Sequence, residues 1–157
     1  MTATILRANY DDPALDHFLR DHLSDLSQTA PAESQHALDY TTMRSTPGFR
    51  LWVADIAGDV VGTVGLGHLD ATHEELKSMR TSPNHRGHGI GRALLHHAIS
   101  DARNRGVRRL SLETGSMEFF APARALYERA GFIDCASFGD YPTDDPNSVF
   151  MTLLLPQ

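Results

Sequence analysis

The sequence is poor in cysteine: Cys135 is the only one among 157 residues, so no disulfide can form within the chain. A lone cysteine is typical of proteins from a reducing compartment, and we therefore expect a cytoplasmic protein. Long hydrophobic runs are also missing, and residues 1–7 lack the apolar core of a signal peptide. These absences predict a soluble protein with no membrane partner.

Basic residues are in the minority, since Lys and Arg number 14 against 20 Asp and Glu, which gives a formal net charge of -6. Nucleic-acid binders usually carry a strongly basic face, so we expect no nucleic-acid partner. The acidic balance favours a small or cationic substrate over an anionic one. The length and the hydrophobic content of 41% fit one domain, residues 1–157, with a sizeable core.

Hydrophobic spacing along the chain predicts a strand, two helices, three strands, a helix, a strand, a helix and two strands. This order indicates an α/β sheet of mixed direction with helices on its faces. We expect helices at about 13–26, 33–43, 89–106 and 119–130, and strands at about 2–8, 49–54, 60–67, 74–81, 107–114, 132–136 and 149–155.

A glycine-rich loop, Arg86 to Gly91 (RGHGIG), joins the strand at 74–81 to the following helix. A helix N-terminus offers unpaired N–H groups and the positive end of the helix dipole, and glycines let the backbone approach an anion closely. The loop lacks the Lys-Ser/Thr of a Walker P-loop, and its glycines alternate as G-x-G-x-G, unlike the Rossmann fingerprint. The alternative is a strand-to-helix turn with no ligand.

The Arg-x-x-Gly-x-Gly pattern in this loop resembles the pyrophosphate loop of the GNAT superfamily of acyl-CoA-dependent N-acyltransferases. A second segment, Ala123 to Phe132, resembles the A-x-x-L-Y-x-x-x-G-F motif that follows that loop in these enzymes. The resemblance covers about 49–155 and implies the GNAT fold: a mixed, mostly antiparallel sheet of about seven strands, splayed between the fourth and fifth and flanked by about four helices. Locally, 75–79, 138–141 and 146–151 resemble a small bacterial subgroup whose acceptors are largely unassigned.

The resemblance implies acetyl-CoA as co-substrate, with the pantetheine arm on the strand before the loop and the pyrophosphate on the loop amides. Carried over to this sequence, the implied coenzyme A contacts are Met79, Arg80, Thr81, Arg86, Gly87, His88, Gly89, Ile90, Gly91, Arg92, Phe120 and Ala123. Phe120 is a departure, because many members have an asparagine there, so that contact is absent here or made otherwise. The histidines near the loop lack zinc-ligand spacing, and we expect no metal.

Tyr127 matches the family tyrosine whose hydroxyl points at the coenzyme A sulfur and can protonate the departing thiolate. An ordinary tyrosine pKa of about 10 suits a group that gives a proton to a thiolate. The resemblance therefore implies that Tyr127 is the catalytic acid.

Acyl transfer to an amine also needs a base that removes a proton from the ammonium. Several family enzymes use a glutamate near the place of Glu75, and the resemblance therefore implies that Glu75 is the first candidate for this base. Strand alternation should put it on one face with Lys77, Met79 and Thr81. An ion pair between Glu75 and Lys77, with no proton chemistry, is the alternative. Other candidate bases are water, His68 and His73.

Acceptor contacts are expected from the second helix and the C-terminal loop, which flank the acyl end of coenzyme A in this fold. The candidates are Ser34, His36, Tyr40, Phe138 and Tyr141. The sequence predicts an N-acetyltransferase that moves an acetyl group from acetyl-CoA to a small-molecule amine in a ternary complex, since no nucleophile for a covalent intermediate is evident. The alternatives are a non-catalytic acyl-CoA-binding regulator and a protein or peptide N-acetyltransferase, and a homodimer stays open.

Overall fold

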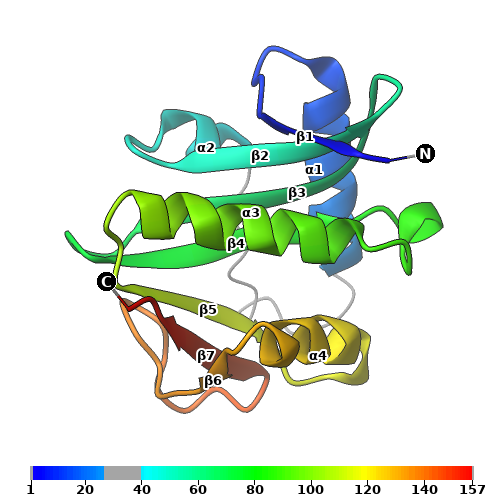
Figure 1. Cartoon of the computed structure of the whole chain (residues 1–157). Helices are drawn as coiled ribbons and strands as arrows, with labels where there is room; N and C mark the ends of the chain where they lie inside the picture. Colours follow the sequence, from blue (N-terminus) through cyan, green and yellow to red (C-terminus); the bar gives the residue numbers. More distant parts are fainter. Residues whose placement is uncertain (1, 27–39, 157) are drawn as a thin grey trace.

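The computed structural model describes residues 2–26 and 40–156 (Figure 1). Its strands form one seven-stranded sheet in the order β1-β2-β3-β4-β5-β7-β6. The elements are β1 Thr4–Arg7, α1 Pro13–Leu26, α2 Tyr40–Ser45, β2 Arg50–Ile56, β3 Asp59–His68, β4 His73–Thr81, η2 Pro83–His85, α3 Ile90–Asn104, β5 Arg109–Gly115, η3 Glu118–Phe120, α4 Ala121–Arg129, β6 Ile133–Asp134 and β7 Ser148–Leu154. The mixed α/β fold and the order of its elements are as predicted.

Strands β4 and β5 form the only parallel pair among the described strands, and they stay together for a short distance. Their pairing ends at Glu75 and Ser111, although β4 runs on to Thr81 and β5 to Gly115. Figure 1 shows the two strands diverging beyond this point. The predicted splay between the fourth and fifth strands is therefore confirmed.

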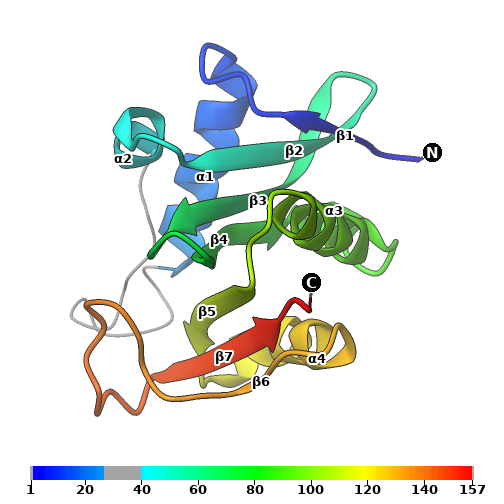
Figure 2. The ribbon, with the colours of Figure 1, turned by 60° about the vertical axis from the view of Figure 1, so that its left-hand side comes forward.

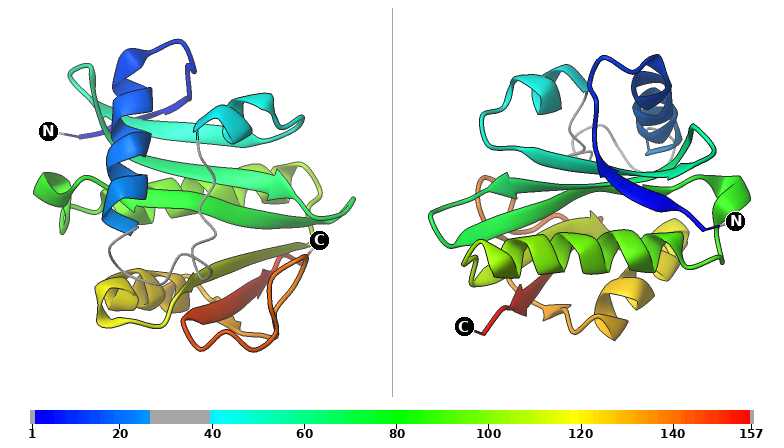
Figure 3. Two further views of the ribbon diagram at one scale, coloured as in Figure 1. Left: turned by 180° about the vertical axis from the view of Figure 1, so that it is seen from behind. Right: turned by 45° about the horizontal axis from the view of Figure 1, so that its top comes forward.

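Helices cover both faces of the sheet. Figure 2 shows α3 and α4 on one side, and α1 and α2 lie on the other, in front of the sheet in the left panel of Figure 3. The α3 side holds the larger core, to which Leu94, Ala98 and Tyr127 contribute, whereas Leu15 and Met43 belong to the core under α1 and α2. The buried side chains of α3 recur every three or four residues, which explains why this segment forms an amphipathic helix.

A bulge interrupts β4 and corrects one prediction. The register with β3 shifts between Thr63↔Arg80 and Gly65↔Lys77, and Ser78 has a φ of 54°. Such a bulge inserts one unpaired residue and so reverses which side chains face each side of the sheet. The expectation that Met79 and Thr81 share a face with Glu75 and Lys77 is therefore wrong.

Contacts on the two faces of β4 show this reversal. A Cβ placed on Gly91 of α3 would lie 3.4 Å from Thr81 Oγ1 and 3.6 Å from Met79 Cε, so both side chains face α3. Across the sheet, Ser78 Oγ lies 3.7 Å from the sulfur of Met43 in α2. The bulge thus turns the side chains of Met79 and Thr81 toward α3.

Smaller differences concern the ends of elements. The predicted second helix, 33–43, lies largely outside the described residues, and α2 continues to Ser45. The strand expected at 132–136 is reduced to Ile133–Asp134. No helix within 2–26 and 40–156 combines the length and the apolarity that crossing a bilayer requires.

Candidate functional site

The glycine-rich loop connects β4 to α3 with an unusual run of free backbone donors. Gly87 and Gly89 have φ angles of 81° and 82°, in the left-handed region that glycine tolerates best, and Gly89 caps the N-terminus of α3. No backbone N–H from Arg86 through Arg92 donates to an acceptor within the described residues; the first helical bond runs from Ala93 N to Gly89 O. The loop and the helix end therefore form a cradle for an anion.

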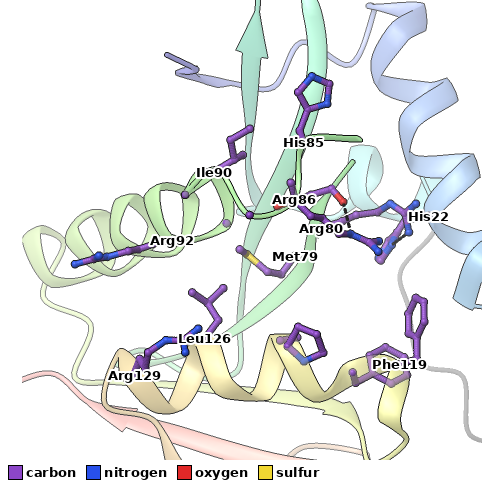
Figure 4. Close-up of a pocket in the computed structure, with 17 residues that line it drawn as sticks. His22, Met79, Arg80, His85, Arg86, Ile90, Arg92, Phe119, Leu126 and Arg129 are labelled. Carbon is purple, nitrogen blue, oxygen red and sulfur yellow. Dashed lines mark hydrogen bonds between the residues drawn. The ribbon is translucent and has the colours of Figure 1, made fainter. Parts of the chain in front are cut away.

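A cleft of about 510 Å³ opens beside this cradle. In Figure 4 it lies between the loop with α3 on one side and α4 on the other. Its lining contains the predicted coenzyme A contacts except His88, whose ring Nδ1 lies 3.2 Å from the His85 carbonyl oxygen. Lining residues outside the predicted set of coenzyme A contacts are His22, His85, Phe119, Pro122, Leu126 and Arg129.

Four arginines line the cleft, one from each of four segments: Arg80 on β4, Arg86 on the loop, Arg92 in the first turn of α3 and Arg129 at the end of α4. Guanidinium groups bind phosphate oxygens through paired N–H donors. Together with the free loop amides, they suit a ligand with several phosphates. The open space at Gly87 and Gly89, where an added Cβ would meet nothing within 4 Å, lets such a ligand reach the backbone. These features fit the diphosphate of coenzyme A.

Phe120, which stands where the family pattern has an asparagine, packs on a glycine. A Cβ on Gly115, the last residue of β5, would lie 2.1 Å from Phe120 Cδ2, so the ring rests on bare backbone. Phe119 packs edge-on against Phe120 with ring centroids 4.9 Å apart. Both rings line the cleft, which gives this end of it an apolar surface.

Tyr127 lies on α4 next to Leu126, which lines the cleft, but is not itself among the lining residues. Its side chain is buried in the α3-side core, and its ring centroid is 5.9 Å from that of Phe132. Burial, with a smaller contribution from the Glu113 carboxylate, raises the pKa of Tyr127 above its ordinary value. The hydroxyl therefore stays protonated at neutral pH, as a proton donor must.

On the other face of the sheet, Glu75, Lys77 and Tyr141 make a closed triangle of polar contacts. Lys77 Nζ lies 3.1 Å from Glu75 Oε2 and donates to the Tyr141 hydroxyl at 2.9 Å, and the Tyr141 hydroxyl donates to Glu75 Oε2. Phe138 and Phe150 pack edge-on against Tyr141. The structure thus brings the predicted Glu75, Phe138 and Tyr141 together, and it also contains the alternative ion pair with Lys77.

Glu113 is a further acidic group that the sequence reading did not single out. It lies on β5 beyond the last residue paired with β4, and its Oε2 accepts a hydrogen bond from Ser148 Oγ at 2.8 Å. Burial raises the pKa of this carboxyl to about 7, although the Ser148 hydrogen bond acts in the opposite direction. In the sequence Ser111 and Glu113 alternate with Leu110 and Leu112 as ordinary outward-facing strand residues would, so only the three-dimensional structure reveals that Glu113 is partly buried.

The other predicted acceptor and base residues have separate environments. His73 Nε2 lies 2.6 Å from Ser111 Oγ, and burial lowers the pKa of His73. His68 Nδ1 lies 3.1 Å from the carboxylate of Glu74. Tyr40 packs edge-on against Tyr10, with ring centroids 5.9 Å apart. It therefore belongs to a different set of contacts from Glu75, Lys77 and Tyr141. Ser34 and His36 lie outside the described residues.

Comparisons with known proteins agree with this geometry. The sequence profile of the acetyltransferase (GNAT) family matches residues 14–132. A Bacillus subtilis (strain 168) protein named uncharacterized N-acetyltransferase YsnE is 46% identical over 134 residues, which are 85% of this chain and 87% of the relative. IAA acetyltransferase of Azospirillum brasilense is 40% identical over 127 residues, 80% of each chain.

A solved structure shows the same fold over nearly the whole chain. The ribosomal-protein-S18-alanine N-acetyltransferase of Escherichia coli superposes with a TM-score of 0.72 at 27% sequence identity, covering 99% of this chain and 95% of the other. The phosphate cradle, the splayed strands and these matches lead to one conclusion: the chain belongs to the acetyltransferase (GNAT) family and is an acetyltransferase.

Proposed function

We propose that this enzyme transfers the acetyl group of acetyl-CoA directly to the amine of a small-molecule acceptor within a ternary complex. The observation that carries the proposal is the run of N–H groups from Arg86 through Arg92 that have no acceptor among residues 2–26 and 40–156, at the mouth of an arginine-lined cleft. Such a cradle binds a diphosphate, and the splay between β4 and β5 leaves backbone on both strands free to hold an extended chain and its thioester.

The chain supplies an acid and a base on opposite sides of the splay. Tyr127, with its raised pKa, protonates the thiolate that leaves when the thioester breaks. On the other face, the two strands that splay carry the carboxylates of Glu75 and Glu113, and a base there removes the proton that blocks the amine nitrogen. Acetyl-CoA itself supplies the activated acyl group.

A small acceptor is favoured by the loop that follows β6. Tyr141 of this loop is hydrogen-bonded to Glu75, and Phe138 packs against both Tyr141 and His73, so aromatic side chains cover this face of the site. A relative with 40% identity bears the name IAA acetyltransferase, which refers to a small molecule. The fold shared with the S18-alanine N-acetyltransferase favours the second candidate, a protein N-terminus as acceptor.

Titration calorimetry with acetyl-CoA, followed by thiol release across a panel of amines, amino acids and N-terminal peptides, tests the function. We expect micromolar binding and release of coenzyme A that depends on a small amine. Release with peptides alone would assign a protein acceptor. Binding without release from any acceptor would indicate a regulator that senses acyl-CoA, and absence of binding would contradict the phosphate cradle.

A further inference from the structure

Glu113 and Glu75 face the same side of the sheet at the splay. Glu113 follows Ser111 by two residues on β5, so alternation puts both side chains on one face, and the Ser111 hydroxyl lies 2.6 Å from the ring of His73 at the start of β4. Glu75, two residues after His73 on β4, points to the same side. The two carboxylates are close enough to interact electrostatically.

The two carboxylates differ in what a proton would do to their hydrogen bonds. Glu75 accepts from the ammonium of Lys77 and from the hydroxyl of Tyr141, both on Oε2. An ammonium can only donate, and the Lys77 side chain is 15% exposed. A proton on Glu75 would leave that cation without its counter-charge, which is unfavourable at such burial.

Glu113, by contrast, can hold a proton without losing its partner. Its hydrogen bond comes from the Ser148 hydroxyl, which donates to a carboxylate and equally accepts from a carboxylic acid after a rotation. Burial also brings the pKa of Glu113 to about 7, where a group can take and release protons at neutral pH. The charged and titratable groups that act on it are Lys77 and Glu75 from β4, Asp145 and Tyr141 from the loop before β7, and Tyr127 from α4.

We propose that Glu113 is the base that takes the proton from the acceptor ammonium, while Glu75, Lys77 and Tyr141 are positioning residues. The inference rests on the proposed amine acetylation and deepens it. It replaces the sequence-based assignment of Glu75 as base with a division of labour between the two carboxylates.

The proton balance follows from this assignment. The acceptor arrives as R–NH₃⁺ and gives one proton to Glu113, which later releases it to water. The neutral nitrogen forms a C–N bond to the acetyl carbon while the C–S bond breaks. The nitrogen then gives up a second proton, which replaces the one that Tyr127 gives to the sulfur. Glu113 and Tyr127 return to their starting states, and one proton is released per turnover.

The test compares wild type with Glu113→Gln and Glu75→Gln in kcat, in KM and in their ratio for the best amine of the panel, measured across about pH 5.5 to 9.5. We expect the wild-type profile to rise through a pKa of about 7. Glu113→Gln should lower kcat at neutral pH by about 100-fold or more, lose that inflection and leave the affinity for acetyl-CoA unchanged. Its activity should recover with rising pH, as the acceptor amine, with a pKa of about 10, deprotonates by itself.

Glu75→Gln should keep the inflection and chiefly raise the KM for the acceptor. Glu128→Gln, which removes an exposed carboxylate of α4, is the matched control and should behave as wild type. An inflection that survives in Glu113→Gln and vanishes in Glu75→Gln would overturn the inference and restore Glu75 as base. Wild-type protein that releases no thiol with any acceptor would overturn the proposed function first, and the inference with it, so the two failures are distinguishable.

Discussion

The hydroxyl of Tyr141 donates a hydrogen bond to the carboxylate of Glu75, although 66 residues separate them in the sequence. Lys77 binds both groups, so the loop before β7 is fastened to β4 at the point where β4 leaves β5. This contact brings the C-terminal part of the chain over the face of the sheet on which we propose that the acceptor binds.

Tyr141→Phe removes the hydroxyl from this triangle and keeps the ring. Glu75 then loses one of its donors, and we expect a loss of about 1 kcal/mol in the free energy of unfolding. The loop should position the acceptor less well, which raises the acceptor KM about fivefold, with little change in acetyl-CoA affinity. Steady-state kinetics and calorimetry measure both constants.

Tyr10→Phe is the matched control, because the Tyr10 hydroxyl is buried and has no hydrogen-bond partner among the described residues. Its removal should leave kinetics unchanged and keep or slightly raise the stability. An unchanged acceptor KM in Tyr141→Phe would show that the loop does not position the acceptor.

Gly89→Ala tests the anion cradle. Gly89 has a φ of 82°, and an alanine there should lower the stability by about 1 to 2 kcal/mol. Its methyl group would also keep phosphate from the backbone, so acetyl-CoA affinity should fall about tenfold or more in a calorimetric titration. Gly58→Ala is the control: Gly58 has a φ of 91°, equally open space and a position in the β2–β3 turn. Equal affinity losses in both variants would contradict a specific role of the loop.

Tyr127→Phe should lower kcat in the thiol-release assay, while the affinity for acetyl-CoA should remain almost unchanged. Because burial raises the pKa of Tyr127, its hydroxyl stays protonated through the neutral range and should add no descending limb to the pH profile there. Steady-state thiol-release measurements give kcat, and titration calorimetry gives the affinity for acetyl-CoA, so the two effects can be separated. A large loss of affinity with unchanged turnover would refute its role as the acid.

The parts of the molecule that the sequence predicts well are those that depend on local chemistry. The loop glycines, the amphipathic spacing of α3 and the terminal Gly106 with its φ of 85° are local signals, and the structure bears out the helix that they define. The splay followed only from the resemblance of two motifs to a known family.

The remaining features depend on long-range packing. Strand alternation assumes a regular ladder of hydrogen bonds. Nothing in the sequence marks Ser78 as the residue that adopts a positive φ and so changes the face on which the following side chains of β4 lie. Phe119 and Arg129 line the cleft only because α4 packs beside the loop. Glu113 is partly buried beside β7, which is distant from it in sequence.

Arg105→Ala tests the clamp that holds the end of α3 to β4. Arg105 makes a bidentate ion pair with Glu74 at 2.7 and 2.8 Å, and the Glu74 side chain is 3% exposed. Its removal leaves a buried carboxylate poorly compensated, and we expect a loss of about 2 to 3 kcal/mol in chemical denaturation. Arg103→Ala, at an exposed position of the same helical turn, should change the stability little. Equal effects of the two variants would show that the pair is not stabilising.

Glu113→Gln should make the protein more stable at alkaline pH while it makes the enzyme less active. The folded protein raises the pKa of Glu113 from 4.5 to about 7, so it binds the proton more tightly than the unfolded chain does. Below the unfolded pKa the carboxyl is neutral in both states and burial is harmless. Between pH 4.5 and 7 the Glu113 carboxyl ionises in the unfolded chain but stays protonated in the folded protein. The free energy of unfolding therefore falls by at most about 3 kcal/mol over this range.

A glutamine has no charge to bury, so the stability gain of Glu113→Gln should be absent near pH 4, grow through the interval and level off above pH 7. Urea denaturation of wild type and variant across this range measures it, and Glu128→Gln should show no such growth. Such a stability cost fits a role for Glu113 in the site, since active sites commonly trade stability for function. A gain that is constant with pH would mean that Glu113 does not titrate in this range and would remove the physical basis for its role as base.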